Sequence, residues 1–312
     1  MAWVEPFVYF GSAEFSRRLL AGLIEADCKP ALVISTSAKP AGRGWRETPT
    51  PVAAYAKAVG LPVVTVKSLK HGLPQELTAS AAIFGLLAAF GKIIPEGLLT
   101  LYPQGIINVH PSLLPRYRGP APIAYALMEG AKETGVSIIK LDAEVDHGPM
   151  LAQQSLVIND NDDAVGLEQR LASLALELLL ASLPKYLAGE LSLTTQRHAQ
   201  ATYSHIVKRA HGQADWSQTA EALNNKRRAF TPWPGLWTTW QGKRLKLIQT
   251  SCRQLDLTAP GKVQLIQSDL VIGCGERTAL IVKTIQLESG RVQTASDFVR
   301  GRKDFINSRL PS

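Results

Sequence analysis

The 312-residue sequence predicts an α/β protein in two parts, an open, mostly parallel (Rossmann-like) sheet followed by a small OB-like β-barrel. Apolar runs alternate with helical stretches over the first 185 residues, which is typical of a parallel sheet covered on both faces. Short β-rich stretches separated by turns fill the last third, as in small barrels. A polar segment lies between the two patterns. We therefore expect a domain over residues 1–184, a linker over 185–205 and a second domain over 206–312.

The elements of the first domain follow from the spacing of apolar residues. In the first helix, Phe15, Leu19 and Leu23 recur at helical spacing and predict one buried face. The expected strands are short, uncharged and β-rich. They cover residues 7–10, 31–34, 62–66, 82–87, 106–109 and 136–141, and the expected helices cover 14–26, 51–59 and 160–187.

The second domain has one expected helix and several strands. The turn from Pro232 to Gly235 contains residues that punctuate chain direction. The helix is expected over 219–228 and the strands over 236–240, 245–250, 262–267, 270–274 and 280–285.

Composition excludes several classes of protein. Apolar residues make up 46% and charged residues 19%, close to ordinary globular usage, so a disordered or fibrous chain is excluded. The longest uncharged apolar run, from Ala79 to Gly91, is shorter than the ~20 residues that a membrane span needs. The start shows no signal-peptide pattern. Three cysteines lie far apart without a CxxC motif, so we expect no disulfide framework, no metal and a cytoplasmic protein.

Positive charge is concentrated in the last third of the chain. Residues 1–202 hold 17 basic and 18 acidic residues, whereas residues 203–312 hold 17 basic and 8 acidic ones, a net charge of +9. Such an asymmetry favours an anionic partner for the second domain. A well-solvated surface is the alternative.

Nucleotide-binding motifs are missing from the first domain. Gly11 follows the first strand without the further glycines of a dinucleotide fingerprint, and Gly91-Lys92 lacks the spacing of a P-loop. The sequence therefore supports neither NAD(P) nor ATP as a ligand.

Asn108 and His110 are the first candidates for catalysis. Side chains two residues apart on a strand share a face, and these two end an apolar strand, where open α/β sheets bind their ligands. A core histidine with satisfied hydrogen bonds, beside a turn-forming asparagine, is the alternative.

Asp146 is a third candidate because it follows the strand expected over 136–141. Placed beside Asn108 and His110, its carboxylate would orient the imidazole and stabilise its protonated form, while the asparagine amide donates to an oxyanion. A plain Asp-x-Gly turn is the alternative. Ser112 lacks the Gly-x-Ser-x-Gly context of a nucleophile. A triad without a nucleophile suits direct transfer of an acyl group to an incoming amine.

The segment around these residues resembles the signature of folate-dependent formyltransferases. The resemblance rests on Asn108-x-His110-x-Ser112-Leu113-Leu114-Pro115-x-Tyr117-Arg118-Gly119 and on Asp146-x-Gly148-x-Met150-Leu151. It implies that Asn108, His110 and Asp146 are catalytic and that 10-formyltetrahydrofolate is the co-substrate, without a metal. The implied co-substrate site is formed by Ser112, Leu113, Leu114, Pro115, Leu86, Gly91 and Leu141.

Other segments resemble the methionyl-tRNA formyltransferases within this superfamily. They are Ala41-Gly42-Arg43-Gly44 with Thr48-Pro49-Thr50-Pro51, and Arg228-Ala229-Phe230-x-Pro232-Trp233-Pro234-Gly235. This resemblance implies initiator methionyl-tRNA as acceptor, and we expect a monomer. A formyltransferase acting on a small amine, such as an amino sugar nucleotide or glycinamide ribonucleotide, is the alternative, and an RNA-binding protein without transferase activity is a further one. The candidate tRNA contacts are Arg43, Trp45, Arg46, Lys208, Arg209, Lys226, Arg227, Arg228, Lys243, Arg244 and Lys246.

The chain departs from the pattern of this family at several positions. Pro111 and Pro120 stand where glycine and alanine are usual, His147 and Pro149 where threonine and aspartate are usual, and Gly11-Ser12-Ala13 where Gly-Thr-Pro is usual. Pro111 removes an amide donor beside His110, so these departures bear on the geometry of the co-substrate site.

Overall fold

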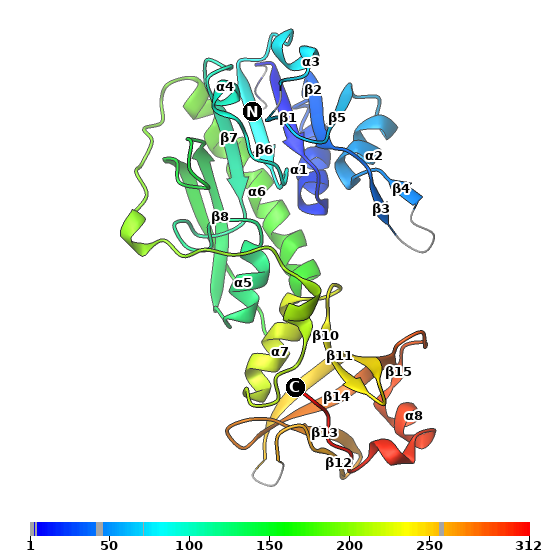
Figure 1. Ribbon diagram of the computed structural model, residues 1–312. Helices are drawn as coiled ribbons and strands as arrows, with labels where there is room; N and C mark the ends of the chain where they lie inside the picture. The colour runs from blue at the N-terminus through cyan, green and yellow to red at the C-terminus, as the bar shows by residue number, and fades with distance from the viewer. Residues whose placement is uncertain (1–2, 4, 42–45, 71, 256–258) are drawn as a thin grey trace. The chain divides into compact units, whose positions relative to one another are not determined.

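The computed structural model describes residues 3, 5–41, 46–70, 72–255 and 259–312. The chain forms two compact units (Figure 1). The first takes in residues 1–122, 133–157 and 168–205, and the second takes in residues 123–132, 158–167 and 206–312.

A seven-stranded sheet forms the centre of the first unit, in the order β5-β2-β1-β6-β7-β8-β9. The first five strands in this order run parallel, while β8 and β9 run antiparallel to their neighbours. This confirms the mostly parallel α/β class. The strands are β1 (Phe7–Gly11), β2 (Leu32–Thr36), β5 (Val63–Val66), β6 (Phe84–Ala88), β7 (Ile106–His110), β8 (Glu133–Lys140) and β9 (Met150–Val157).

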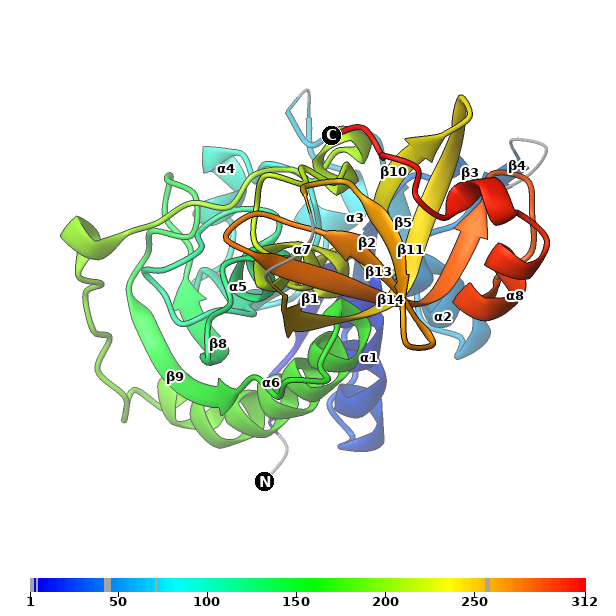
Figure 2. The same ribbon diagram turned by 90° about the horizontal axis from the view of Figure 1, so that it is seen from below.

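Helices cover the sheet because its central strands are apolar on both faces, and β1, β2 and β7 are buried along their whole length. Two of the helices, α1 and α6, lie side by side (Figure 2), and Gly22 of α1 is in contact with Leu176 of α6. Most of α5 and the start of α6 belong to the second unit. The helices are α1 (Glu14–Glu25), α2 (Pro51–Ala58), α3 (Gln75–Thr78), α4 (Glu96–Leu99), α5 (Pro122–Met128) and α6 (Ala164–Leu187).

The strand β8 runs antiparallel to β7, with His110 opposite Ser137 and Ile107 opposite Lys140. An antiparallel edge on an otherwise parallel sheet is common, and here it forms a hairpin with β9, a strand that periodicity did not predict. The chain therefore leaves β8 at the amino end of β7, where Leu141 N donates to Ile106 O at 2.8 Å. The following loop has to fold back to approach His110.

A small hairpin of β3 (Lys39–Ala41) and β4 (Arg46–Thr48) follows β2. Two of the residues expected to contact tRNA, Arg43 and Trp45, lie outside the described residues. For Arg46 only the backbone, at the start of β4, is described.

The second unit contains an antiparallel sheet in the order β10-β11-β14-β13-β12, with β15 paired to β14. Its inner face, together with α7 and α8, encloses an apolar core around Trp216, Leu223 and Phe298. The elements are α7 (Ala220–Ala229), β10 (Leu236–Trp240), β11 (Lys243–Gln254), β12 (Val263–Ile266), β13 (Asp269–Gly273), β14 (Thr278–Leu287), β15 (Gln293–Thr294) and α8 (Ala295–Arg300).

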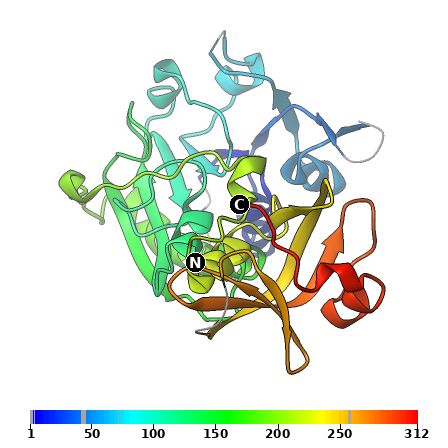
Figure 3. The same cartoon turned by 60° about the horizontal axis from the view of Figure 1, so that its bottom comes forward.

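The C-terminal segment links the two ends of this sheet. Figure 3 shows its red trace running from α8 over the strands. Val263 N of β12 donates to Ser308 O, and the Thr238 hydroxyl of β10 donates to Pro311 O. The sheet is thereby closed into a barrel-like form by the chain end.

No helix in the described part of the chain is long and apolar enough to cross a membrane.

Candidate active site

Asn108 and His110 lie on the same face of β7, because side chains alternate along a strand. Each is only 5% exposed. Buried polar side chains need hydrogen-bond partners, and both find the same partner in Asp146. The carboxyl oxygen Oδ1 accepts from Asn108 Nδ2 at 3.0 Å, and Oδ2 lies 3.5 Å from His110 Nδ1.

The loop after β7 completes the environment of the imidazole. His110 Nε2 lies 3.0 Å from Tyr117 O, and because a carbonyl only accepts, Nε2 carries a proton in this arrangement. Two residues further on, Gly119 N donates to Asp146 Oδ2 at 2.8 Å. Tyr117 and Gly119 both have positive φ angles, 59° and 104°, so this loop is sharply turned between the two contacts.

The cluster has the groups needed for acyl transfer. The Asn108 amide has a second N–H beyond the one bound to Asp146, which can donate to an oxyanion. His110 holds a proton and faces a carboxylate that stabilises an imidazolium. The structure therefore brings the three predicted side chains together.

The environment of Ser112 disfavours a role as a nucleophile. Its side chain is fully buried, and its hydroxyl donates to Arg116 O at 2.7 Å. Within the described part of the chain, this hydroxyl has no hydrogen bond to a histidine that could remove its proton. The cluster thus combines an imidazole, a carboxylate and an amide donor without a serine nucleophile, an arrangement that suits enzymes that transfer an acyl group directly between two bound molecules.

The residues expected around the co-substrate occupy different environments. Leu114 is buried, and its amide donates to the Ser137 hydroxyl. Leu86 is fully buried on β6, and its register partner is Ile107, which points away from the Asn108 face. Its side chain therefore does not face Asn108, and any contact with the co-substrate falls to the main chain. Leu113 and Pro115 are half-buried, beside Leu114.

Two more of these residues lie further along the sheet. Leu141 is half-buried and packs against the apolar cluster that contains Phe10 and Ile106. Gly91 borders a hollow of about 310 Å³ that Lys67, Lys70 and Lys92 also line. Its φ of +74° favours glycine.

The lysine and arginine residues expected to contact tRNA differ in how far their side chains are buried. Arg228 is 8% exposed, and its guanidinium donates to Asp162 O at 2.6 Å and to Asn159 O at 2.7 Å. Arg228 as a tRNA contact stays a prediction, which its burial disfavours because the guanidinium already donates to main-chain carbonyls inside the second unit.

The neighbours of Arg228 on α7 are half-buried. Burial lowers the pKa of Lys226, whose ammonium donates to Gln213 O at 3.3 Å, and burial also lowers the pKa of Arg227. Lys208, Arg209 and Lys243 are exposed.

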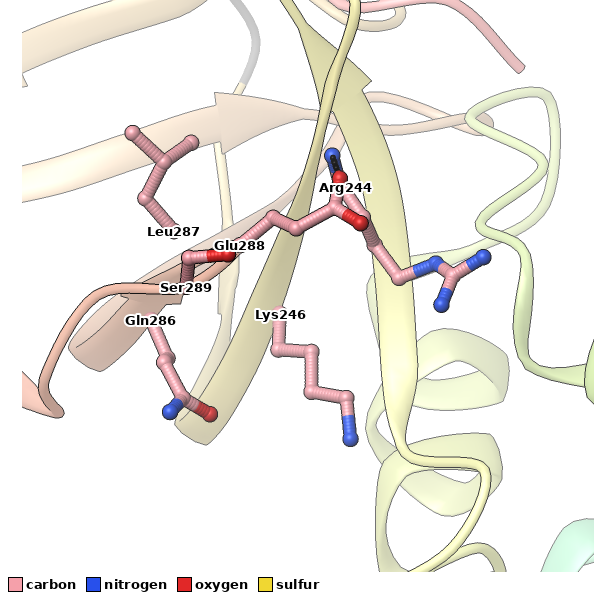
Figure 4. Close-up of a pocket in the computed structure, with 6 residues that line it drawn as sticks. All are labelled: Arg244, Lys246, Gln286, Leu287, Glu288 and Ser289. Atoms are coloured by element: carbon pink, nitrogen blue, oxygen red, sulfur yellow. Dashed lines mark hydrogen bonds between the residues drawn. The ribbon is translucent and has the colours of Figure 1, made fainter. Parts of the chain in front are cut away.

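Arg244 and Lys246 extend from β11 beside the turn after β14 (Figure 4). With Gln286, Glu288 and neighbouring residues they line a shallow hollow of about 160 Å³. The Arg244 guanidinium stacks over the Trp237 ring at 4.8 Å, which presents a flat cation at the surface.

Sequence reasoning missed Gln196, and it placed Arg118 in the family signature without giving its side chain a role. The segment expected to be a linker belongs to the first unit, and Gln196 within it is buried and donates to the main chain of the loop that carries Asp146. A polar segment gives no local sign that one amide is buried, so only the pairing of distant loops could reveal it.

Comparisons with known proteins agree with this class. Residues 7–183 match the formyl transferase family, and residues 206–303 match the C-terminal domain of formyl transferases. The methionyl-tRNA formyltransferase of Anaeromyxobacter sp. (strain K) is 37% identical over 304 residues, which cover 95% of this chain and 97% of the relative. That of Enterococcus faecalis (strain ATCC 700802 / V583) is 37% identical over 297 residues, covering 94% and 95%.

A solved structure shares the fold. The N-formyltransferase from Helicobacter canadensis, in complex with folinic acid and dTDP-3-aminofucose, aligns with a TM-score of 0.66 at 17% identity, covering 90% of this chain and 99% of the other. On the full-length matches, the chain belongs to the formyl transferase family and, within it, to the methionyl-tRNA formyltransferases.

Proposed function

We propose that the protein transfers a formyl group from 10-formyltetrahydrofolate to the α-amino group of methionine on initiator tRNA, supporting translation initiation. The observation that carries the proposal is the cluster that the buried Asn108 and His110 on one face of β7 form with the half-buried Asp146 from the loop after β8, without a serine nucleophile beside it. The membership of the chain in the formyl transferase family, with relatives that match nearly its full length, supports the same reaction.

The reaction forms one C–N bond and breaks another. The free methionyl amine attacks the formyl carbon, and the Asn108 amide stabilises the oxyanion of the tetrahedral adduct. As an imidazolium paired with Asp146 through Nδ1, His110 gives its Nε2 proton, which faces Tyr117 O before the reaction, to the folate nitrogen as the C–N bond breaks. Protonation is needed because an amine anion is a very poor leaving group. Asp146 holds the imidazole in place and stabilises its charge. The attacking nitrogen loses its proton to solvent water as the adduct collapses, so one proton leaves the amine while one is supplied to the folate nitrogen.

The folate co-substrate lies, in this proposal, along the carboxyl ends of β6 and β7. The residues proposed to border it are Ser112, Leu113, Leu114, Pro115, Gly91 and Leu141, with Leu86 contributing main-chain atoms only. The proposal includes no metal ion. Within the described residues there is no group of three or more potential metal-ligating side chains.

The tRNA acceptor is assigned to the basic residues of the last third. Phosphate contacts require accessible cations, and the exposed Lys208, Arg209 and Lys243 meet this requirement. Arg244 is half-buried, but we count it with them because its guanidinium is held over the Trp237 ring beside a surface hollow. Lys226, Arg227 and Lys246 are also half-buried and have no such ring beneath them, so they are secondary candidates. The loop with Arg43, Trp45 and Arg46 stays a prediction.

We further propose a monomer that acts in the cytoplasm, where charged tRNA is made and used. The division into a catalytic domain (1–184), a linker (185–205) and a tRNA-binding domain (206–312) also stays a proposal.

One assay separates the proposed function from its alternative. The purified protein is incubated with radiolabelled 10-formyltetrahydrofolate and offered methionyl initiator tRNA, methionyl elongator tRNA, an amino sugar nucleotide and glycinamide ribonucleotide in parallel. We expect label on initiator tRNA at a rate at least 100-fold above the others. Preferred transfer to a small amine would replace the proposed acceptor, and tRNA binding without transfer would remove the catalytic assignment.

A further inference from the structure

Gln196 reaches from the expected linker into the loop that carries Asp146. Its side chain is 3% exposed, and its Nε2 atom donates to Asp146 O at 2.9 Å and to Gly148 O at 2.7 Å. Both hydrogens of the amide are thus used on two carbonyls of one short loop. The amide therefore ties the main chain on either side of His147.

The loop needs such an external tie because its backbone is unusual. Asp146 has a φ of +49°, in the left-handed region that non-glycine residues rarely adopt. Gly148 packs so closely on Lys140 O that no Cβ would fit there. A strained residue keeps its conformation only when its surroundings hold it, and the Gln196 amide is such a restraint.

Arg118 holds the other end of the same amide. The guanidinium is buried, and its Nη2 atom donates to Gln196 Oε1 at 2.8 Å and lies 2.9 Å from His198 Nδ1. With its oxygen and both N–H groups engaged, Gln196 has one orientation that satisfies all of its partners.

The position of Arg118 closes a ring of contacts around the candidate site. It stands between Tyr117, whose carbonyl accepts from His110, and Gly119, whose amide donates to the Asp146 carboxylate. The Asp146 residue is therefore held at its carboxylate by Gly119 and at its carbonyl by Gln196. The same loop restrains both the carboxylate and the imidazole that faces it.

A second set of bonds fixes the segment that carries Gln196. Tyr117 N donates to the Thr202 hydroxyl, Arg118 N to Thr202 O, and Ser204 N to Arg118 O, with distances of 2.7–2.9 Å. The segment is thus attached to the loop after β7 independently of the Gln196 side chain, so removing that amide leaves the attachment in place.

We propose that Gln196, oriented by Arg118, is a positioning residue for the formyl transfer. Its hydrogen bonds go to Arg118, Asp146 O and Gly148 O, and it acts by fixing the Asp146 backbone so that the carboxylate faces Asn108 and His110. The inference rests on the proposed function, because it assumes that Asp146 serves in catalysis. Displacement of a catalytic group by about 1 Å costs on the order of 100-fold in rate.

The test replaces Gln196 by methionine in the full-length protein, which keeps the length and volume of the side chain and removes the amide. We expect kcat for formylation of methionyl initiator tRNA to fall 10- to 100-fold, with KM for tRNA and for 10-formyltetrahydrofolate changed less than twofold. Rates are normalised to the folded protein concentration, measured by binding of tetrahydrofolate. The matched control is Gln200→Met, an exposed glutamine four residues further on, with kcat unchanged.

A double-mutant cycle distinguishes positioning from general stability. If Gln196 acts through Asp146, Gln196→Met should lower the residual kcat of Asp146→Asn by less than twofold, because the two effects are not additive. Equal effects of Gln196→Met in both backgrounds, or a kcat within twofold of wild type in the single variant, would overturn the inference.

Should Gln196→Met not fold, Arg118→Lys provides a second variant, because lysine keeps the charge and loses the fork that donates to Gln196 and faces His198. The same drop in kcat at constant KM is expected, and an unchanged kcat would overturn the inference. A wild-type protein that formylates no methionyl initiator tRNA would instead overturn the proposed function itself.

Discussion

At the scale of single residues, Asp146 connects the candidate catalytic groups. One oxygen accepts from Asn108, and the other accepts from Gly119 N and faces His110. A carboxylate with two oxygens can satisfy these partners at once. The pattern of two polar residues on a strand and one after a turn therefore becomes a single hydrogen-bonded unit.

Replacement of Asn108 or His110 by alanine should abolish most of the transfer rate. We expect kcat to fall by about 10²–10³-fold for Asn108→Ala, which removes an oxyanion donor, and by about 10²–10⁴-fold for His110→Ala, which removes the acid. Single-turnover formylation measures the loss, and tRNA binding should change less than twofold. The exposed Asn159→Ala provides the matched control, and near-normal rates in both active-site variants would reject the assignment.

Glu168 on α6 allows a test of how burial of a carboxyl group affects the stability of the fold. Burial, with a smaller contribution from Glu14, raises the pKa of its carboxyl above 4.5, although Arg18 opposes the shift. A raised folded-state pKa means that the neutral carboxyl stabilises the fold below the unfolded-state pKa, and that this stabilisation is lost as pH rises through the folded-state value.

Glu168→Gln should therefore raise the melting temperature at pH 7 by about 1–2 °C, and the gain should vanish near pH 4. Thermal unfolding followed by circular dichroism at both values measures the difference. Glu177→Gln, on an exposed position of the same helix, is the control. A variant less stable than wild type at pH 7 would show that the charged form is the favoured one.

At the scale of elements, α7 shows how a helix separates neighbouring cations. Successive residues turn by about 100°, so Lys226, Arg227 and Arg228 point in different directions from one run of basic residues. Arg228 turns inward, where it donates to the carbonyls of Asn159 and Asp162. One cation of this basic run, Arg228, therefore stabilises the second unit, and the three cations do not form one common surface for an anionic partner.

Arg228→Met should destabilise the protein without weakening tRNA binding directly. Two main-chain carbonyls, of the exposed Asn159 and the half-buried Asp162, lose charge-assisted donors, at a cost of about 1–3 kcal/mol, which urea unfolding measures. The exposed Lys243→Met should do the opposite, leaving the unfolding midpoint unchanged and raising KM for tRNA several-fold. If Arg228→Met instead kept full stability and lost tRNA affinity, Arg228 would be a contact after all.

At the scale of the whole molecule, positive charge is distributed unequally along the chain, and the two proposed substrates should therefore respond differently to salt. The last 110 residues carry a net charge of +9, whereas the first 202 are nearly neutral. A nucleic acid releases counterions when it binds cations. A small folate engages few such contacts, so salt should separate the two substrates.

Raising salt from 50 to 200 mM should increase KM for tRNA by about 10²-fold if the four leading cations each contact a phosphate. Over the same range KM for 10-formyltetrahydrofolate should change less than twofold. Steady-state kinetics at several salt concentrations gives the slope of log KM for tRNA against log salt concentration. Lys243→Met should reduce this slope by about one. A KM for tRNA that is insensitive to salt would remove the basic residues from recognition.

The sequence by itself determined the parallel strands of the first unit, most of its helices, the antiparallel second unit and the pair of Asn108 and His110 on one face of β7. These features follow from alternation, helical period and turn residues, which act over a few positions. They depend little on which distant segments become neighbours.

Only the tertiary structure decided the direction of β8, the return of the Asp146 loop to β7, the burial of Arg228 and the contacts of Gln196. Each depends on a partner far along the chain. A polar or charged side chain looks the same in sequence whether it meets water or a buried carbonyl, because the difference lies in which group folding places opposite to it.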